Sequence, residues 1–374
     1  MKNLYTEEKI KSHSLNLIKE ASELLYDYLL VAEGNFSNEF LERKNKRLGY
    51  FLNKIFKRMG FHIMRNMYYN QWIKFNADPH GKLICLATIT SILSHFEEWD
   101  RAFDFLNDDK SKRLYDWFIK FRFAYAFIGE AASEIFEPPI SLKEYNGKLE
   151  QMKKRKGNNL YIVDNFQIDS DINILVDVFV FEEYRYGNSI SPQANNIVLD
   201  IGAYKGETAI WFSKYIGAKG EVYAFEPSNK SYDCLLKNIN RNKLENIIIP
   251  QKIAIYKNSG NMGFFDNGEA GDSLGEDSKN FIPTISIDDF MNKNSLGRVD
   301  FIKMDIEGSE LEALQGGINT IKKYKPTLAI AVYHKPDDLI KILEFLHFSV
   351  PEYKFYLSHK SPFWTDTVLF ATPA

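Results

Sequence analysis

From residue 196 to the C-terminus, short β-branched runs alternate with amphipathic segments, and this alternation constrains the fold more than any other feature. The expected strands are 197–199, 222–225, 247–249, 301–304 and 327–332. The expected helices are 208–215, 231–240, 310–323 and 337–345. Strands that alternate with helices form a parallel sheet with right-handed crossovers. The last two runs, 353–357 and 368–371, have no helix between them, so they predict an antiparallel pair at one edge of the sheet.

The first 140 residues instead have the apolar spacing of successive helices. Residues 34–38 carry turn-forming side chains and predict a break between two helices. Further helices are expected over 39–56, 83–106 and 110–127. We therefore expect three parts: a helical domain over 1–140, a linker over 141–190, and the sheet domain over 191–374. The linker carries a short hairpin, 161–168, and a helix, 172–184.

Composition excludes several classes of protein. The 374 residues are 45% hydrophobic and 26% charged, which is enough apolar material for a large core. A formal net charge of -3 argues against a basic nucleic-acid binder. The charged N-terminus lacks the apolar core of a secretory signal, and no apolar run reaches the roughly 18 residues of a membrane span. Two cysteines, Cys85 and Cys234, are too few for a disulfide framework, which favours a reducing, cytoplasmic setting.

The segment from Val198 to Thr208 carries the most specific motif, an apolar strand that runs into a glycine loop and a helix. Gly202 permits a tight turn and close backbone approach to a ligand, and Gly206 lets the helix begin beside it. The spacing differs from the G-x-G-x-x-G of nicotinamide sites. Asp200 and Glu207 place carboxylates around the loop, which suits a ligand with a cationic part, such as S-adenosylmethionine (SAM). A glycine turn without a ligand is the alternative.

Two further acids follow predicted strands of the same sheet. Glu226 ends the second strand, where a carboxylate can accept both ribose hydroxyls of an adenosine, and Pro227 fixes the turn after it. Asp305 ends the fourth strand. Ligands of open α/β sheets bind outside the carboxyl ends of the strands. We therefore expect Asp200, Glu226 and Asp305 to converge on one edge.

These segments resemble the FkbM family of SAM-dependent methyltransferases, over residues 197–371. The residues that carry the resemblance form five blocks, 198–208, 225–227, 285–290, 301–310 and 333–339. Ser228-Asn229 and Ser309 depart from the residues most frequent in the family. The resemblance implies a class I methyltransferase fold, a Rossmann-like sheet that binds SAM at its switch point. It also implies methyl transfer to a hydroxyl group, often of a sugar, glycolipid or polyketide.

On this reading SAM is the cofactor. The residues expected to bind it are Asp200, Gly202, Ala203, Gly206, Thr208, Glu226, Pro227, Ala254 and Asp305. Ala254 belongs to an apolar slot for the adenine, beside the third strand. The glycine-rich loop 267–273 is a hypothetical lid over SAM, with an ordinary hairpin loop as the alternative.

The expected catalytic residues are Asp305, Glu307 and His334. Asp305 should face the methionine end of SAM, and His334 is the candidate general base, because neutral imidazole accepts a proton near pH 7. Helix capping by Glu307 and packing by His334 are the alternatives. The three side chains could also bind a divalent metal, since mixed carboxylate and imidazole ligands suit several ions. Lys303 fits either an anionic substrate or an ion pair.

The expected acceptor is a hydroxyl of a sugar, glycolipid or surface polysaccharide precursor, and no nucleic acid or membrane span is expected. The sequence leaves open whether the helical domain forms a homodimer interface, a substrate lid or a docking face. Two rival functions are a noncatalytic SAM-binding module and a nicotinamide oxidoreductase. The loop spacing and the antiparallel final pair disfavour the oxidoreductase.

Overall fold

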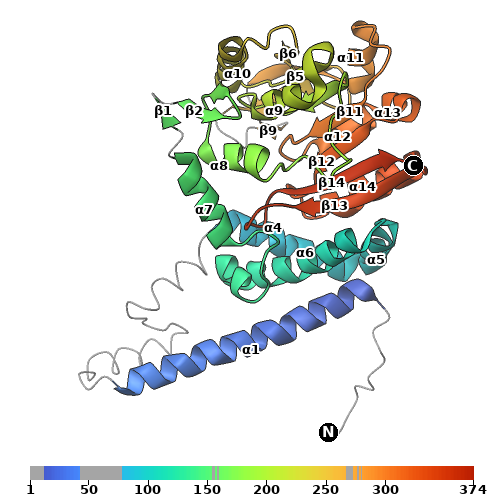
Figure 1. Cartoon of the computed structure of the whole chain (residues 1–374). Coiled ribbons are helices and arrows are strands. Elements are labelled where there is room, and N and C mark those ends of the chain that lie inside the picture. The colour runs from blue at the N-terminus through green and yellow to red at the C-terminus, as the bar shows by residue number, and fades with distance from the viewer. Residues whose placement is uncertain are drawn as a thin grey trace. The chain divides into compact units, whose positions relative to one another are not determined.

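The computed structural model describes residues 12–42, 78–153, 156–157, 160–266, 273–275, 278 and 280–374. The chain divides into two compact units, each described here by itself. The helical unit comprises residues 1–100 and 116–138, and the sheet unit comprises residues 101–115 and 139–374. Figure 1 labels their elements along the chain.

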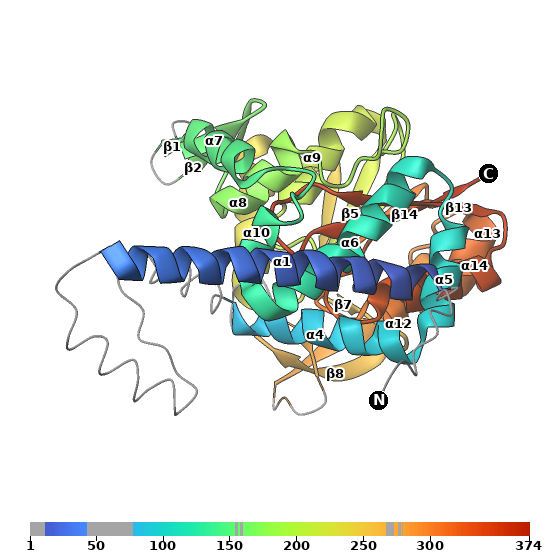
Figure 2. The ribbon, with the colours of Figure 1, turned by 90° about the horizontal axis from the view of Figure 1, so that it is seen from below.

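The helical unit is built on α1 (His13–Glu42) and α4 (Pro79–Ser94), which run alongside each other in Figure 2. Asp78 begins α4, because its Oδ1 accepts a hydrogen bond from Gly81 N at 2.9 Å. The predicted break at 34–38 is wrong. Helix α1 continues through it to Glu42, and one internal glycine costs a helix only about 1 kcal/mol.

The other helix predictions for the first 140 residues have mixed outcomes. The helix expected over 83–106 is two helices, α4 and α5 (Phe96–Phe105), which separate at His95. The helix over 110–127 is confirmed as α6 (Asp109–Ile128). The helix expected over 39–56 lies outside the described residues beyond position 42. No helix within the described ranges has both the length and the apolar character that a membrane crossing requires.

The sheet unit contains a seven-stranded sheet in the order β13-β14-β12-β11-β4-β5-β6. The strands are β4 (Ile197–Ile201), β5 (Glu221–Phe225), β6 (Ile248–Gln251), β11 (Phe301–Met304), β12 (Thr327–Ala331), β13 (Tyr353–His359) and β14 (Thr367–Pro373). Strands β4, β5, β6, β11 and β12 are parallel, and β14 runs antiparallel to both of its neighbours. The predicted parallel sheet and its antiparallel final pair are confirmed. Strand order reverses between β4 and β11.

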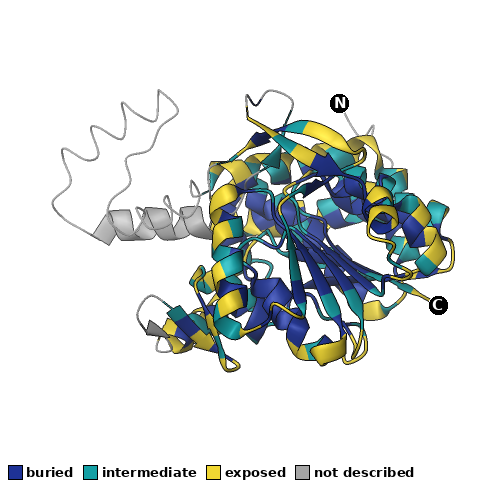
Figure 3. Ribbon diagram, turned by 90° about the horizontal axis from the view of Figure 1, so that it is seen from above, coloured by how far each residue is buried: buried dark blue, intermediate teal, exposed yellow. Residues whose placement is uncertain are grey.

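The strands form the core of this unit, and Figure 3 shows them as a dark, buried layer between more exposed helices. The helices are α9 (Glu207–Ile216), α10 (Asn229–Asn242), α11 (Ile287–Lys293), α12 (Glu310–Gln315), α13 (Ile318–Tyr324) and α14 (Asp338–Ser349). The single helix expected over 310–323 is interrupted at Gly316 and Gly317. A Cβ on Gly316 would lie 2.6 Å from the carbonyl oxygens of Tyr256 and Lys257, so the chain needs glycine there.

The segment before the sheet forms α7 (Leu142–Lys153), β1 (Lys156–Gly157) and the predicted hairpin, β2 (Leu160–Val163) with β3 (Phe166–Ile168). The helix expected over 172–184 is shorter. It consists of α8 (Ile172–Leu175) and a π-helical turn, η2 (Val176–Val180). A second, small sheet was not predicted. It contains β7 (Ala254–Ile255), β8 (Gly260–Phe265), β9 (Ser273–Leu274) and β10 (Phe281–Ile285).

Residues 101–115 lie against the outer edge of β13, and we call them the edge strap. Asn107 N donates to Phe355 O at 2.9 Å, and Phe355 N donates to Asn107 Oδ1 at 2.6 Å. Leu357 N donates to Ser111 Oγ at 2.9 Å. The strap therefore satisfies backbone groups that an edge strand would otherwise expose.

Candidate functional site

A cavity of about 260 Å³ opens at the carboxyl ends of β4, β5 and β11, where the strand order reverses. This is the position at which open α/β sheets bind ligands. Its lining includes seven of the nine residues expected to bind a cofactor, namely Gly202, Ala203, Thr208, Glu226, Pro227, Ala254 and Asp305. Asp200 and Gly206 are not among the lining residues.

The glycine loop is held in a conformation that other residues cannot adopt without strain. Gly202 has φ 85°, and a Cβ there would lie 1.8 Å from the carbonyl oxygen of Asp305. Gly206 has φ 95°, and a Cβ there would lie 2.6 Å from the side chain of Leu235. Gly202 thus lets β4 and β11 come together beneath the cavity, while Gly206 lets α9 pack against α10.

Asp200 is fully buried behind the cavity wall. It was expected to contact a ligand directly, but it is not among the residues that line the cavity. Its Oδ2 accepts a hydrogen bond from Thr208 Oγ1 at 2.6 Å, and its Oδ1 lies 3.4 Å from Lys303 Nζ. Lys303 also donates to the carbonyl oxygen of Gly202 at 2.6 Å. Burial would lower the pKa of Lys303, but Asp200, Asp305 and Glu183 hold it above its usual value. Lys303 is therefore a pairing lysine that fixes the glycine loop.

Glu226 is oriented by the backbone around it. Its Oε2 accepts a hydrogen bond from Tyr204 N at 2.9 Å, and its Oε1 accepts one from Ser228 N at 2.8 Å. Both carboxylate oxygens are thereby fixed at the wall of the cavity. Pro227 and Ala254 line the cavity on the same side as Glu226, with Ala254 in β7.

Asp305 follows β11 and is fixed by two tyrosines. Tyr184 Oη donates to its Oδ2 at 2.7 Å, and Tyr333 Oη donates to its Oδ1 at 3.4 Å. Burial raises the pKa of Asp305, but the charges of Lys303 and His334 and the two tyrosine hydrogen bonds outweigh it and hold the pKa below its usual value. Asp305 thus presents a carboxylate to the cavity.

His334, which the sequence predicts as a general base, does not line the cavity and is surrounded by carboxylates. Its side chain is 8% exposed, with Nδ1 3.0 Å from Glu310 Oε1 and Nε2 3.4 Å from both Asp305 Oδ1 and Glu307 Oε2. Burial alone would lower the pKa of His334, but the three carboxylates raise it to about 10. The imidazole is therefore already protonated near pH 7. The sequence analysis grouped Asp305 and Glu307 with this histidine but did not include Glu310.

Glu307 is the acid of this group that reaches the cavity most freely. It lines the cavity, and its side chain is 35% exposed. Its φ of 55° is unusual for a residue with a side chain, and such strain is concentrated at functional sites. Burial raises the pKa of Glu307 to about 7, helped by Asp305 and Glu310 and opposed by His334.

Several acids of the cavity were not predicted from the sequence. Asp177, Glu183 and Asp366 line it from η2, the segment after η2 and the β13–β14 connection. Burial, followed by their mutual repulsion, raises the pKa of Asp177 and of Glu183 well above the usual value. No spacing in the sequence marks these three acids as parts of one site. The loop proposed as a lid lies outside the described residues over positions 267–272.

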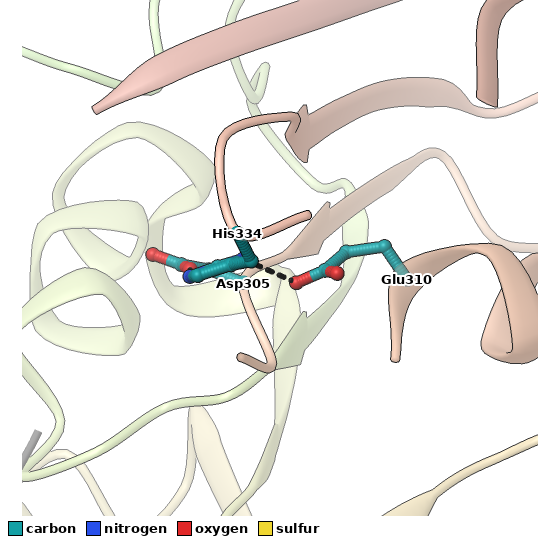
Figure 4. A group of neighbouring side chains, drawn as sticks. All are labelled: Asp305, Glu310 and His334. Carbon is teal, nitrogen blue, oxygen red and sulfur yellow. Dashed lines mark ion pairs between the residues drawn. The ribbon is translucent and has the colours of Figure 1, made fainter. Parts of the chain in front are cut away.

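One group of side chains has the composition of a metal site. Asp305, Glu310 and His334 come from three different elements, and one ligand atom of each lies within 4.8 Å of the others (Figure 4). The sequence grouped Asp305 and His334 with Glu307 in this role and did not include Glu310.

Comparison with known proteins agrees with this geometry. Residues 200–356 match the model of the methyltransferase FkbM domain. A hexuronic acid methyltransferase, AglP of Haloferax volcanii, is 27% identical over 157 residues, which cover 40% of this chain and 62% of that protein. The solved structure of the methyltransferase FkbM from Methylobacillus flagellatus KT superposes with a TM-score of 0.52 at 20% identity, covering 75% of this chain and 60% of that one.

The chain thus spans about three fifths of the length of each of these two relatives. The superposition and the strand order both show the class I methyltransferase fold expected from the sequence. Residues 200–356 of this chain are therefore a methyltransferase FkbM domain.

Proposed function

We propose that the chain is a SAM-dependent methyltransferase that binds SAM in the cavity at the switch point. The observation that carries this proposal is the charge of the lining. Among the described residues, seven acids line the cavity, Asp177, Glu183, Glu207, Glu226, Asp305, Glu307 and Asp366, against one basic residue, Lys303. SAM carries a sulfonium and an ammonium, which the ionised carboxylate of Asp305 attracts and whose charge favours the ionised form of the other lining acids. The pyrophosphate of a nicotinamide dinucleotide would instead be repelled.

The residues present fit SAM at each end. Glu226, held by Tyr204 N and Ser228 N, lies after the second strand, where a carboxylate accepts the two ribose hydroxyls of an adenosine. Ala254 and Pro227 supply apolar surface for the adenine. Asp305, fixed by Tyr184, offers its carboxylate to the ammonium of the methionine part. When bound, SAM supplies a methyl group activated by the positive sulfur.

We propose a sugar hydroxyl as the acceptor and Glu307 as the base. The carboxylate of Glu307 reaches the cavity, so it can take the proton from the hydroxyl as the oxygen forms its bond to the methyl carbon. His334 and Asp305 then have a positioning role, since the imidazolium lies 3.4 Å from both carboxylates and fixes them relative to one another. A sugar acceptor agrees with the name of the Haloferax volcanii relative.

Two measurements test this function. Calorimetry on the purified chain should detect binding of SAM and S-adenosylhomocysteine but not of NAD. A panel of sugars and sugar nucleotides should then support formation of S-adenosylhomocysteine with a methylated product. Binding without turnover on any acceptor would favour a noncatalytic SAM-binding module, and absence of binding would refute the proposal.

A further inference from the structure

The group formed by Asp305, Glu310 and His334 has a feature that an ordinary ion-pair cluster lacks. Asp305 follows β11, Glu310 is the first residue of α12, and His334 follows β12. Figure 4 shows the three side chains directed toward one another from these separate elements. Their ligand atoms all lie within 4.8 Å of one another. That separation is short enough for one ion to contact all three.

The second feature is that buried polar atoms in this group have no hydrogen-bond partner. Glu310 is 0% exposed and His334 is 8% exposed. Neither nitrogen of His334 makes a hydrogen bond within the described structure, and neither does Glu310 Oε2. Each buried polar atom left in this way costs about 1–3 kcal/mol, so native proteins leave few of them without a purpose.

The distances explain why hydrogen bonds are absent although the atoms are close. Nε2 of His334 lies 3.4 Å from Asp305 Oδ1, and Nδ1 lies 3.0 Å from Glu310 Oε1, yet neither contact has hydrogen-bond geometry. Two ligands of one metal ion, each roughly 2.1 Å from it, lie roughly 3.0–3.4 Å apart. The two ring nitrogens point in diverging directions, so one ion would bind only one of them. The separations fit a metal site as well as an ion pair, and the buried, unused Oε2 of Glu310 favours the metal site.

The remaining contacts leave ligand atoms available. Glu310 Oε1 accepts a hydrogen bond from Ile306 N at 2.8 Å, which fixes the carboxylate and leaves Oε2 unused. Asp305 Oδ2 accepts a 2.7 Å hydrogen bond from Tyr184, whereas Oδ1 has longer contacts, each of 3.4 Å, with Tyr333 Oη and His334 Nε2. Glu307 Oε2, 3.4 Å from His334 Nε2, offers a further oxygen from the cavity side.

We propose that Asp305, Glu310 and His334 bind one divalent first-row transition-metal ion, such as Mn²⁺ or Zn²⁺. Two carboxylates and one imidazole suit these ions better than Mg²⁺ or Ca²⁺, which prefer oxygen ligands alone. The ion would displace the proton that His334 carries in its absence, balance the charge of the two carboxylates, and fix Asp305 at the edge of the cavity. The site does not depend on the proposed methyl transfer, because metal binding is measured without SAM or acceptor.

The test uses the full chain after removal of metals with a chelator. Titration with Mn²⁺, followed by the electron paramagnetic resonance signal of the free ion, should show one saturable site per chain. His334→Ala and Glu310→Gln should each weaken that site at least tenfold. Glu312→Gln removes the same charge from the same helix, outside the group, and should bind Mn²⁺ as the unchanged chain does.

A spectroscopic measurement on the unchanged chain keeps the proposal testable if the variants fail to fold. Electron spin-echo spectroscopy of bound Mn²⁺ should show coupling to an imidazole nitrogen. Absence of saturable binding, absence of nitrogen coupling, or equal binding by folded His334→Ala and the unchanged chain would each overturn the proposal.

Discussion

The ammonium of Lys303, at the third position of β11, donates a 2.6 Å hydrogen bond to the carbonyl oxygen of Gly202, in the loop after β4. One buried side chain thus joins the two strands at the switch point. Asp200, buried on the same side, neutralises the lysine. The shape of the glycine loop therefore depends on a charge pair that lies behind the cavity.

Replacing this lysine should affect both stability and cofactor binding. Lys303→Met leaves Asp200 buried and unpaired, so we expect a loss of about 3–5 kcal/mol in the free energy of unfolding. SAM should bind at least tenfold more weakly, because the glycine loop loses its anchor. Denaturant unfolding and calorimetry measure the two effects. Lys335→Met removes a half-exposed lysine that lies 3.6 Å from Glu312, and it should change neither quantity appreciably.

The glycine loop itself allows a sharper comparison. Gly202→Ala places a methyl group 1.8 Å from the carbonyl oxygen of Asp305, so it should abolish detectable SAM binding and destabilise the fold. Gly217→Ala has a similarly positive φ, 67°, but nothing within 4 Å of the new Cβ. It should cost about 1–3 kcal/mol, because φ 67° with ψ -172° is a conformation that essentially only glycine adopts, and it should leave SAM binding intact. If both substitutions weakened SAM binding equally, backbone strain at a positive φ, and not the close approach of the Asp305 carbonyl oxygen, would explain the need for glycine at position 202.

Glu207 should make stability depend on pH. It is buried, and burial raises its pKa to about 7, although a hydrogen bond from Ser170 opposes the rise. The folded state therefore holds this proton more tightly than the unfolded state. The protonated side chain therefore adds to the free energy of unfolding. This contribution is fully present below the unfolded pKa near 4.5 and is lost as pH rises through 7, a change on the order of 3 kcal/mol.

Urea unfolding between pH 5 and pH 8 measures this effect. The stability of the unchanged chain relative to Glu207→Gln should fall across that range and level off above it. Glu245→Gln, at an exposed position, controls for the loss of one negative charge. Parallel pH curves for Glu207→Gln and the unchanged chain would contradict the prediction.

Glu307→Gln tests the proposed base. We expect kcat to fall by about 10²-fold or more, because the hydroxyl proton loses its acceptor. The dissociation constant of SAM should stay within about threefold, since the amide keeps the shape of the side chain. Steady-state kinetics and calorimetry separate the two quantities, with Glu312→Gln as the charge-matched control. An unchanged kcat would remove Glu307 from the mechanism.

The acidic lining also predicts acceptor preference. A hexuronate brings a negative charge into a cavity that Asp305 lines with an ionised carboxylate, whereas a neutral hexose does not. We therefore expect kcat/KM to be at least tenfold higher for neutral sugars than for the matching uronates. Added salt should lower this ratio of kcat/KM values, because it screens the repulsion between the uronate and the lining carboxylates. A preference for uronates at low salt would indicate that residues beyond the described lining determine acceptor choice.

Local features made much of this site predictable. Strands with a recognisable sequence pattern precede Gly202, Glu226 and Asp305. Because ligands of such sheets bind at the carboxyl ends of the strands, these residues could be predicted to lie at one site. The charge of His334 was not predictable, because it depends on Glu310, which reaches the ring only when the end of β12 meets the start of α12. Glu183 and Asp366 approach each other from distant segments, and nothing in their spacing indicates it. The small second sheet was missed because its strands are short and partly exposed.

The edge strap has a consequence for how this chain meets other chains. Asn107 and Ser111 occupy the hydrogen-bonding groups of Phe355 and Leu357, so at these positions β13 cannot accept a strand from another molecule. A fragment that begins at residue 141 would keep every strand of the large sheet, but it would expose the hydrogen-bonding edge of β13. Such a fragment is expected to self-associate through β13, which the edge strap would otherwise prevent.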